Sequence, residues 1–251
     1  MDERIMCGLF YGHRGAAGEA PENTLDGFHH ARQLGVQAFE LDVRLSVDGV
    51  PMVIHDEDLC RTTGRAITVS QHRATELARL SAFKQWPGWT GPALIPTLTQ
   101  VLEDHADLPA FQIEIKTDGS QPLDLLCRQV ITVIEEFDLL QRVVVTSFDS
   151  RALRHLRDQA PYIRRGFIAR FDRPEHLQAA LELECRNVCI PLLTSCPEAV
   201  RQAQAQDIHV TGWLGNTVES LKQLLAWQVD SITGDYPGLA LPFLRERGYL
   251  E

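Results

Sequence analysis

The sequence has no long apolar run, and its basic residues are outnumbered by its acidic ones. Its 251 residues include 24 Lys and Arg against 34 Asp and Glu, for a formal net charge of −10. This balance argues against a general nucleic-acid-binding protein, which would present a basic surface to phosphates. No apolar stretch approaches the roughly 20 residues that span a bilayer, so we expect no stable membrane association.

Paired cysteines and a secretion signal are also missing. The six cysteines, Cys7, Cys60, Cys127, Cys185, Cys189 and Cys196, form no CxxC pair. The last three could form a metal site, but Cys189 lies in an apolar run that favours a buried free thiol. The N-terminus, Met1-Asp2-Glu3-Arg4, is acidic and has no signal-peptide core. Reduced thiols and this N-terminus predict a cytoplasmic protein.

Short strand-like runs alternate with helix-like segments along the chain. The runs cover residues 9–13, 38–42, 111–116, 143–148, 165–169, 187–192, 208–213 and 231–235. Helical patterns cover 24–34, 98–105, 123–137, 150–159, 174–183, 198–206, 218–227 and 239–247. Eight alternations in about 250 residues predict an α/β fold, the (β/α)8 TIM barrel. A doubly wound open sheet is the alternative.

One region after the second predicted strand interrupts this rhythm. Residues 47–49 are typical of a hairpin turn, and the apolar run 51–55 would return beside the strand and bring His55 alongside Asp42. We therefore expect a single domain over 1–251, with a small hairpin and cap insertion at about 43–96. The cap would cover the barrel mouth, where TIM-barrel active sites lie. Its Trp86 and Trp89 could contact the substrate or pack the insertion onto the barrel.

Two predicted strands carry acids on the face that should be apolar. Side chains alternate between faces along a strand, so Glu40 and Asp42 share one face, and Glu114 and Lys116 share one face of the next strand. Burying unpaired carboxylates is costly. A hard divalent cation removes that cost, which predicts a Mg²⁺ or Ca²⁺ site on Glu40, Asp42 and Glu114.

Histidines and basic residues end the strands beside these acids. His13 and Arg14 end the first strand, and His55 ends the returning hairpin strand. Imidazole titrates near neutrality, so two histidines beside a metal suit general acid and base catalysis. Arg14 and Lys116 suit a phosphate group. Each residue alone has an ordinary structural explanation, but their joint position at strand ends predicts displacement at phosphorus.

These residues give the chain a specific resemblance to the glycerophosphodiester phosphodiesterase family. The matching motifs are His13-Arg14-Gly15, Pro21-Glu22-Asn23-Thr24, Glu40-Leu41-Asp42, Asp48-Gly49-Val50-Pro51 with His55-Asp56, Ile95-Pro96-Thr97-Leu98, Glu114-Ile115-Lys116, Ser147-Phe148, Trp213 and Asp235-Tyr236-Pro237. The resemblance implies a TIM barrel with this insertion, a divalent metal on Glu40, Asp42 and Glu114, and His13 as base with His55 as acid. It implies a small-molecule substrate, a glycerophosphodiester hydrolysed to sn-glycerol 3-phosphate and an alcohol.

Two departures from the family pattern fall near the expected place of the substrate's organic part. Leu214-Gly215 replaces a Thr-Val pair, and Gly234 replaces a threonine. They put the preferred alcohol in doubt. Trp213 could stack on the substrate or close the barrel rim, and Asn23 could reach the substrate or help cap the first helix.

Two other functions match parts of the pattern. A phospholipase C- or D-like barrel acting on lipid phosphodiesters would need an apolar, membrane-facing rim. A non-catalytic barrel that binds a phosphorylated metabolite would be expected to lack a histidine or a metal carboxylate, and all five are present. The sequence leaves open the oligomeric state and the nucleophile, which is water or the substrate's own hydroxyl.

Overall fold

Eight parallel strands close into a barrel in the computed structural model, which describes residues 8–117, 119, 121–171 and 173–250. The strands are β1 Leu9–His13, β2 Ala38–Leu45, β4 Ala110–Ile115, β5 Val143–Ser147, β6 Arg164–Ile168, β7 Asn187–Pro191, β8 His209–Trp213 and β9 Ser231–Gly234. β1 pairs with both β2 and β9, which closes the ring. The predicted TIM barrel is confirmed, and the open-sheet alternative is wrong.

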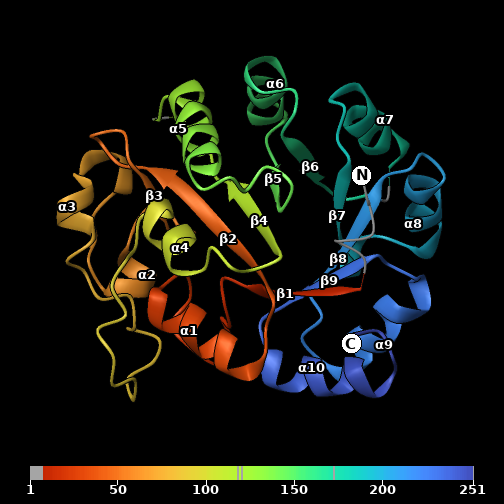
Figure 1. Ribbon diagram of the computed structural model, residues 1–251, viewed down its shortest axis with the longest axis horizontal. Coiled ribbons are helices and arrows are strands. Elements are labelled where there is room, and N and C mark those ends of the chain that lie inside the picture. Colours follow the sequence, from red (N-terminus) through yellow and green to blue (C-terminus); the bar gives the residue numbers. More distant parts are fainter. Residues whose placement is uncertain (1–7, 118, 120, 172, 251) are drawn as a thin grey trace.

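Helices surround the strands (Figure 1). They are α1 Leu25–Leu34, α4 Leu98–Asp104, α5 Leu123–Glu136, α6 Ser150–Gln159, α7 Pro174–Glu182, α8 Pro197–Gln204, α9 Val218–Trp227 and α10 Pro237–Glu246. Their apolar faces pack on outward-facing strand residues such as Phe39 and Leu41, in one continuous core. None of the helices described is long and apolar enough to cross a membrane.

The barrel interior is filled in layers that follow strand parity. Tyr11, Ala38, Ala110 and Val144 form a small buried apolar cluster of their own. Ala38 has the same parity as Glu40 and Asp42 on β2, and Ala110 the same parity as Glu114 on β4. The inward positions therefore change from apolar to acidic as the strands approach their carboxyl ends. The predicted inward placement of the acids follows from this register.

The predicted hairpin forms directly after the inward acids of β2. β2 extends to Leu45, three residues beyond the predicted end, and β3 Pro51–Val53 returns antiparallel to it. The backbone N–H of Ile54 then donates to the Asp42 carbonyl at 3.0 Å, which sets His55 beside the acids. Pairing of Val43 and Leu45 with β3 explains why the strand continues beyond the predicted end.

The rest of the insertion has its own small core. It contains α2 Cys60–Thr63, the 3₁₀ turn η2 Val69–Gln71 and α3 Ala74–Leu77, which lie beside β2 and α4 (Figure 1). Buried Met52, Ile54 and Leu59 belong to an apolar cluster separate from the barrel core. Trp89 instead packs against the barrel core, and its indole N–H donates to Asp26 at 3.1 Å.

The cysteines of the described chain are free thiols. Cys127, Cys185 and Cys189 are buried, whereas Cys60 and Cys196 are exposed. Cys7 and the N-terminal residues 1–4 considered above lie outside the described residues.

Candidate active site

A cavity of about 190 Å³ lies at the carboxyl ends of the barrel strands. Its lining is His13, Arg14, Glu40, His55, Gln112, Glu114, Lys116, Phe148, Ile168, Cys189, Trp213, Leu214 and Thr233. The fold therefore brings most of the predicted site residues to one place. Asp42 and Asn23 are the exceptions, since they are almost fully buried and do not line it.

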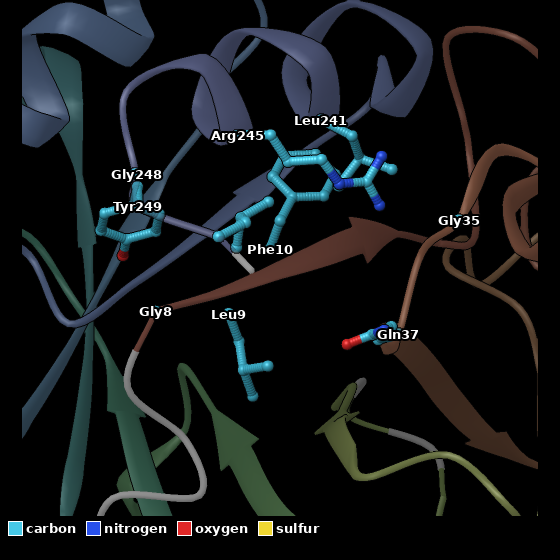
Figure 2. Close-up of a pocket in the computed structure, with 10 residues that line it drawn as sticks. Gly8, Leu9, Phe10, Gly35, Gln37, Leu241, Arg245, Gly248 and Tyr249 are labelled. Carbon is cyan, nitrogen blue, oxygen red and sulfur yellow. The ribbon is translucent and has the colours of Figure 1, made fainter.

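A larger cavity, of about 440 Å³, lies at the opposite end of the barrel. Figure 2 shows Arg245 and Tyr249 beside the start of β1, with Gln37 on the other side. Its lining, as far as the structure describes it, contains no carboxylate or histidine. The predicted acid–base and metal-binding groups lie at the other end, as expected for a TIM barrel.

Three buried carboxylates cluster at the smaller cavity, of which Glu40 and Glu114 line it and Asp42 is buried beside them. One oxygen each of Glu40, Asp42 and Glu114 lies within 4.8 Å of the others. Asp42 and Glu114 face each other in register on β2 and β4. The buried oxygens Asp42 Oδ1 and Glu114 Oε1 both lie against Lys116 Nζ, at 3.1 and 2.6 Å. Three buried carboxylates at this spacing offer the all-oxygen ligand set that fits a hard divalent cation.

The pKa values of the three acids are shifted in different directions. Burial raises the pKa of Glu40 well above its usual range, and the Asp42 and Glu114 carboxylates add to this. Burial also raises the pKa of Glu114, to about 7, against the opposing effect of Lys116. For Asp42, Lys116 and Arg14 outweigh burial and hold its pKa far below the usual range. Asp42 is therefore the carboxylate that stays ionised most firmly.

Two residues of the loop after β1 contact the Asp42 carboxylate. Asn23 Nδ2 donates to Asp42 Oδ2 at 2.8 Å, and Arg14 Nε lies 3.1 Å from the same oxygen. Arg14 and Asn23 both have left-handed backbone angles, with φ of 52° and 54°. The adjacent Thr24 caps α1, accepting from the Gly27 N–H at 3.0 Å. The structure thus gives Asn23 a contact with Asp42, and its substrate contact stays a prediction.

Each histidine is oriented by a carboxylate at Nδ1. His13 Nδ1 donates to Asp235 Oδ1, and Asn216 Nδ2 donates to the other Asp235 oxygen at 2.5 Å. His55 Nδ1 lies 2.7 Å from Asp56 Oδ1. The Nε2 atom of each ring is left for the cavity, and that of His13 lies 3.7 Å from Glu40. A carboxylate at Nδ1 fixes the tautomer and the orientation of the ring.

Three supporting residues, Asp235, Asp56 and Arg61, were given no role from the sequence, although Asp235 and Asp56 belong to family motifs. Arg61 Nε donates to Asp56 at 2.6 Å, and its other nitrogens contact Glu22 at 2.5 and 2.7 Å. Glu22 also accepts from Arg14 at 2.9 Å. The sequence signal for two of them was their position: Asp56 directly follows His55, and Asp235 lies at the end of a predicted strand.

The apolar side of the cavity contains Leu214, one of the residues that depart from the family pattern. The Phe148 and Trp213 rings meet edge to face with centroids 6.2 Å apart, and Leu214 also lines the cavity. The Trp213 indole N–H is buried without a hydrogen-bond partner among the described residues. A side chain at Gly234 would approach the Gly215 carbonyl to 2.8 Å, so these two departures are packed against each other.

Comparison with known proteins identifies the family. The model of the glycerophosphoryl diester phosphodiesterase family matches residues 13–239. A glycerophosphodiester phosphodiesterase of Caldanaerobacter subterraneus subsp. tengcongensis is 30% identical over 244 residues, which cover 97% of this chain and 100% of the relative. The solved Oleispira antarctica phosphodiesterase, in complex with the product sn-glycerol-3-phosphate, has a TM-score of 0.88 and 26% identity, covering 95% of this chain and 97% of that one. This chain belongs to the glycerophosphoryl diester phosphodiesterase family.

Proposed function

We propose that the cavity at the carboxyl ends of the strands hydrolyses a glycerophosphodiester to sn-glycerol 3-phosphate and an alcohol. Phosphodiester hydrolysis is the activity of the family to which the chain belongs. One observation carries the assignment to this cavity: it is lined by two histidines, each held by its own carboxylate, and by two members of the cluster of three buried carboxylates. The small cavity and the product bound to the Oleispira relative support a small-molecule substrate.

We propose Glu40, Asp42 and Glu114 as the ligands of a divalent metal. All three offer oxygen, which suits either Mg²⁺ or Ca²⁺. The bound ion would polarise a phosphoryl oxygen and stabilise negative charge developing on it. Lys116 and Arg14, which balance the carboxylates, add positive charge on either side and would bind the remaining phosphate oxygens.

The two histidines would move the protons. His13, with Nδ1–H donated to Asp235, has Nε2 free to take a proton from the nucleophile. His55 would protonate the leaving oxygen. Burial lowers the pKa of His55, whereas Asp56 and the carboxylate of Asp42 favour its protonated form. An anionic phosphate bound beside the ring would favour the protonated form further.

The organic part of the substrate would meet the apolar side of the cavity. Trp213 lines the cavity beside Phe148, which supports a contact between its ring and the glycerol or alcohol part of the substrate. Leu214, where the family carries threonine, would lower the polarity there. We also propose that region 43–96 serves as hairpin and cap within one domain, supported by its separate apolar cluster and by His55. The free thiols fit a cytoplasmic location.

The test is release of sn-glycerol 3-phosphate from glycerophosphocholine. The protein is first treated with a chelator, and a coupled assay then follows the reaction without metal, with Mg²⁺ and with Ca²⁺. We expect activity to return with one or both ions. Phosphorus NMR of the products separates direct hydrolysis from a route through a cyclic phosphate. No release of glycerol 3-phosphate with either ion would contradict the proposal.

A further inference from the structure

A second group of metal-ligating side chains lies outside the active site. His29 is on α1, Asp104 is the last residue of α4, and His105 follows it. One ligand atom from each lies within 4.8 Å of the others. His29 Nε2 contacts Asp104 Oδ2, and His105 Nε2 lies 3.4 Å from the same oxygen. Residues 75 positions apart in the chain thus meet at one point.

The His105 side chain shows that this cluster is not fully satisfied by the protein. The residue is 3% exposed, and its Nε2 atom is buried without a hydrogen-bond partner among the described residues. The ring packs against Phe28 and Phe39, with centroids 6.0 and 5.1 Å away, and edge-on to His29 at 5.4 Å. This packing holds the ring with Nε2 toward the other two ligands. A buried ring nitrogen without a partner is costly, and a metal ion would remove that cost.

We propose that His29, Asp104 and His105 form a Zn²⁺ site that joins α1 to the end of α4. Two imidazole nitrogens and one carboxylate are a zinc ligand set, in contrast to the all-oxygen cluster of the active site. Three protein ligands leave a coordination position for water. The His29 and Asp104 side chains are 52% and 39% exposed, so the ion can enter from solvent.

The surroundings do not oppose a cation at this place. The nearby Arg32 guanidinium on α1 is paired with Asp107 at 2.7 Å, which balances its charge. α1 follows the loop that carries Arg14 and Asn23, and α4 follows the insertion. An ion between these helices would therefore stabilise the frame on both sides of the active site by binding the folded chain.

The experiment is a calorimetric Zn²⁺ titration of the whole chain, with Mg²⁺ held at saturation to occupy the carboxylate site. The variants are His29→Gln and Asp104→Asn, both at exposed side chains, so the buried His105 is left in place. His155→Gln on α6 is the control. We expect one Zn²⁺ per chain, with an affinity at least about tenfold weaker in both variants and unchanged in the control.

A second readout distinguishes this site from other zinc binding. Co²⁺ in place of Zn²⁺ should show the ligand-field absorption of a nitrogen-containing site in the parent protein and the control. Asp104→Asn and His29→Gln should reduce that absorption. No saturable Zn²⁺ binding to the parent protein, or equal affinity in the parent and both variants, would overturn the proposed site. Since His29 and Asp104 do not line the active-site cavity, this outcome is independent of the phosphodiesterase assay.

Discussion

The pairing of His13 with Asp235 allows a direct test of which histidine is the base. In Asp235→Asn, the new amide must still accept the hydrogen bond from Asn216 Nδ2, which fixes its oxygen on that side. Its NH₂ group then faces His13 Nδ1 in place of a carboxylate oxygen. His13 Nδ1 becomes the acceptor, and the proton moves to Nε2. A base that must take a proton at Nε2 is thereby placed in the wrong tautomer.

The size of the effect follows from two lost interactions. Restoring the working tautomer would set two N–H groups against each other, leaving a donor unsatisfied at a cost of about 1–3 kcal/mol. The variant also lacks the charge-assisted hydrogen bond to the imidazolium, worth about 1.5–3 kcal/mol. The sum of about 2.5–6 kcal/mol corresponds to a rate loss of about 10²- to 10⁴-fold.

Asp56→Asn is the matched control for the other histidine. Asp56 Oδ2 accepts from Arg61 Nε at 2.6 Å, so the new amide again keeps its oxygen on that side and turns NH₂ toward His55. The imidazolium that a general acid needs would then set its Nδ1–H against this NH₂ group, so we expect a loss of similar size on glycerophosphocholine. On a nitrophenyl ester, whose leaving group needs no proton, the loss for Asp56→Asn should be much smaller.

The assay is kcat on glycerophosphocholine at saturating metal, with thermal melts to confirm that both variants fold. The nitrophenyl ester should restore Asp56→Asn and leave Asp235→Asn impaired, and the opposite pattern would reverse the roles of the two histidines. An Asp235→Asn variant as active as the parent would refute the orienting role of Asp235.

Four further predictions concern the metal, the acid, the insertion and the thiols. Glu114→Gln should weaken Mg²⁺ binding, measured by calorimetry, at least about tenfold, because even the loss of a residue that only supports a ligand has an effect of this size. Unchanged affinity would mean that Glu114 is not a ligand. Because burial raises its pKa to about 7, the parent should release protons on binding Mg²⁺, with affinity rising as the pH passes through neutrality. His55→Ala should lower kcat about 10²-fold on glycerophosphocholine but less on a nitrophenyl ester, whose leaving group needs no proton; equal losses would argue against a general acid. Trp89→Phe should cost about 1 kcal/mol of stability through the lost Asp26 hydrogen bond, lowering Tm by about 2–4 °C with KM unchanged; a changed KM with an unchanged melt would mean a substrate contact. Burial raises the pKa of Cys127 to about 12, so alkylation near neutral pH should label exposed Cys60 and spare Cys127, and equal labelling by mass spectrometry would contradict this.

The barrel and the inward placement of its acids were predictable because both depend on local periodicity. Parity along single strands places Glu40, Asp42 and Glu114 inward without any knowledge of tertiary contacts. Helix α10 begins at Pro237, two residues before the predicted start, because proline suits the first helical position. The error affects a boundary and not the topology.

The supporting contacts were not predictable because they join elements far apart in the chain. Nothing local to Asp56 or Arg61 indicates that Arg61 reaches Glu22, 39 residues earlier. Asn23 could equally cap a helix by its residue type, and its bond to Asp42 depends on how the loop after β1 folds back. The place of Trp89 on the barrel core likewise depends on its meeting Asp26 across the insertion.

Closure of the barrel by β1 and β9 has a consequence for chains that are still being made. His13 and Asp235 lie 222 positions apart and meet because the first and last strands pair. A nascent chain that has not yet reached β9 already contains the three carboxylates and both histidines. It still lacks the carboxylate that orients the proposed base. Full hydrolytic competence would therefore arrive only with the last strand, so the appearance of activity during synthesis or refolding reports the moment at which the ring closes.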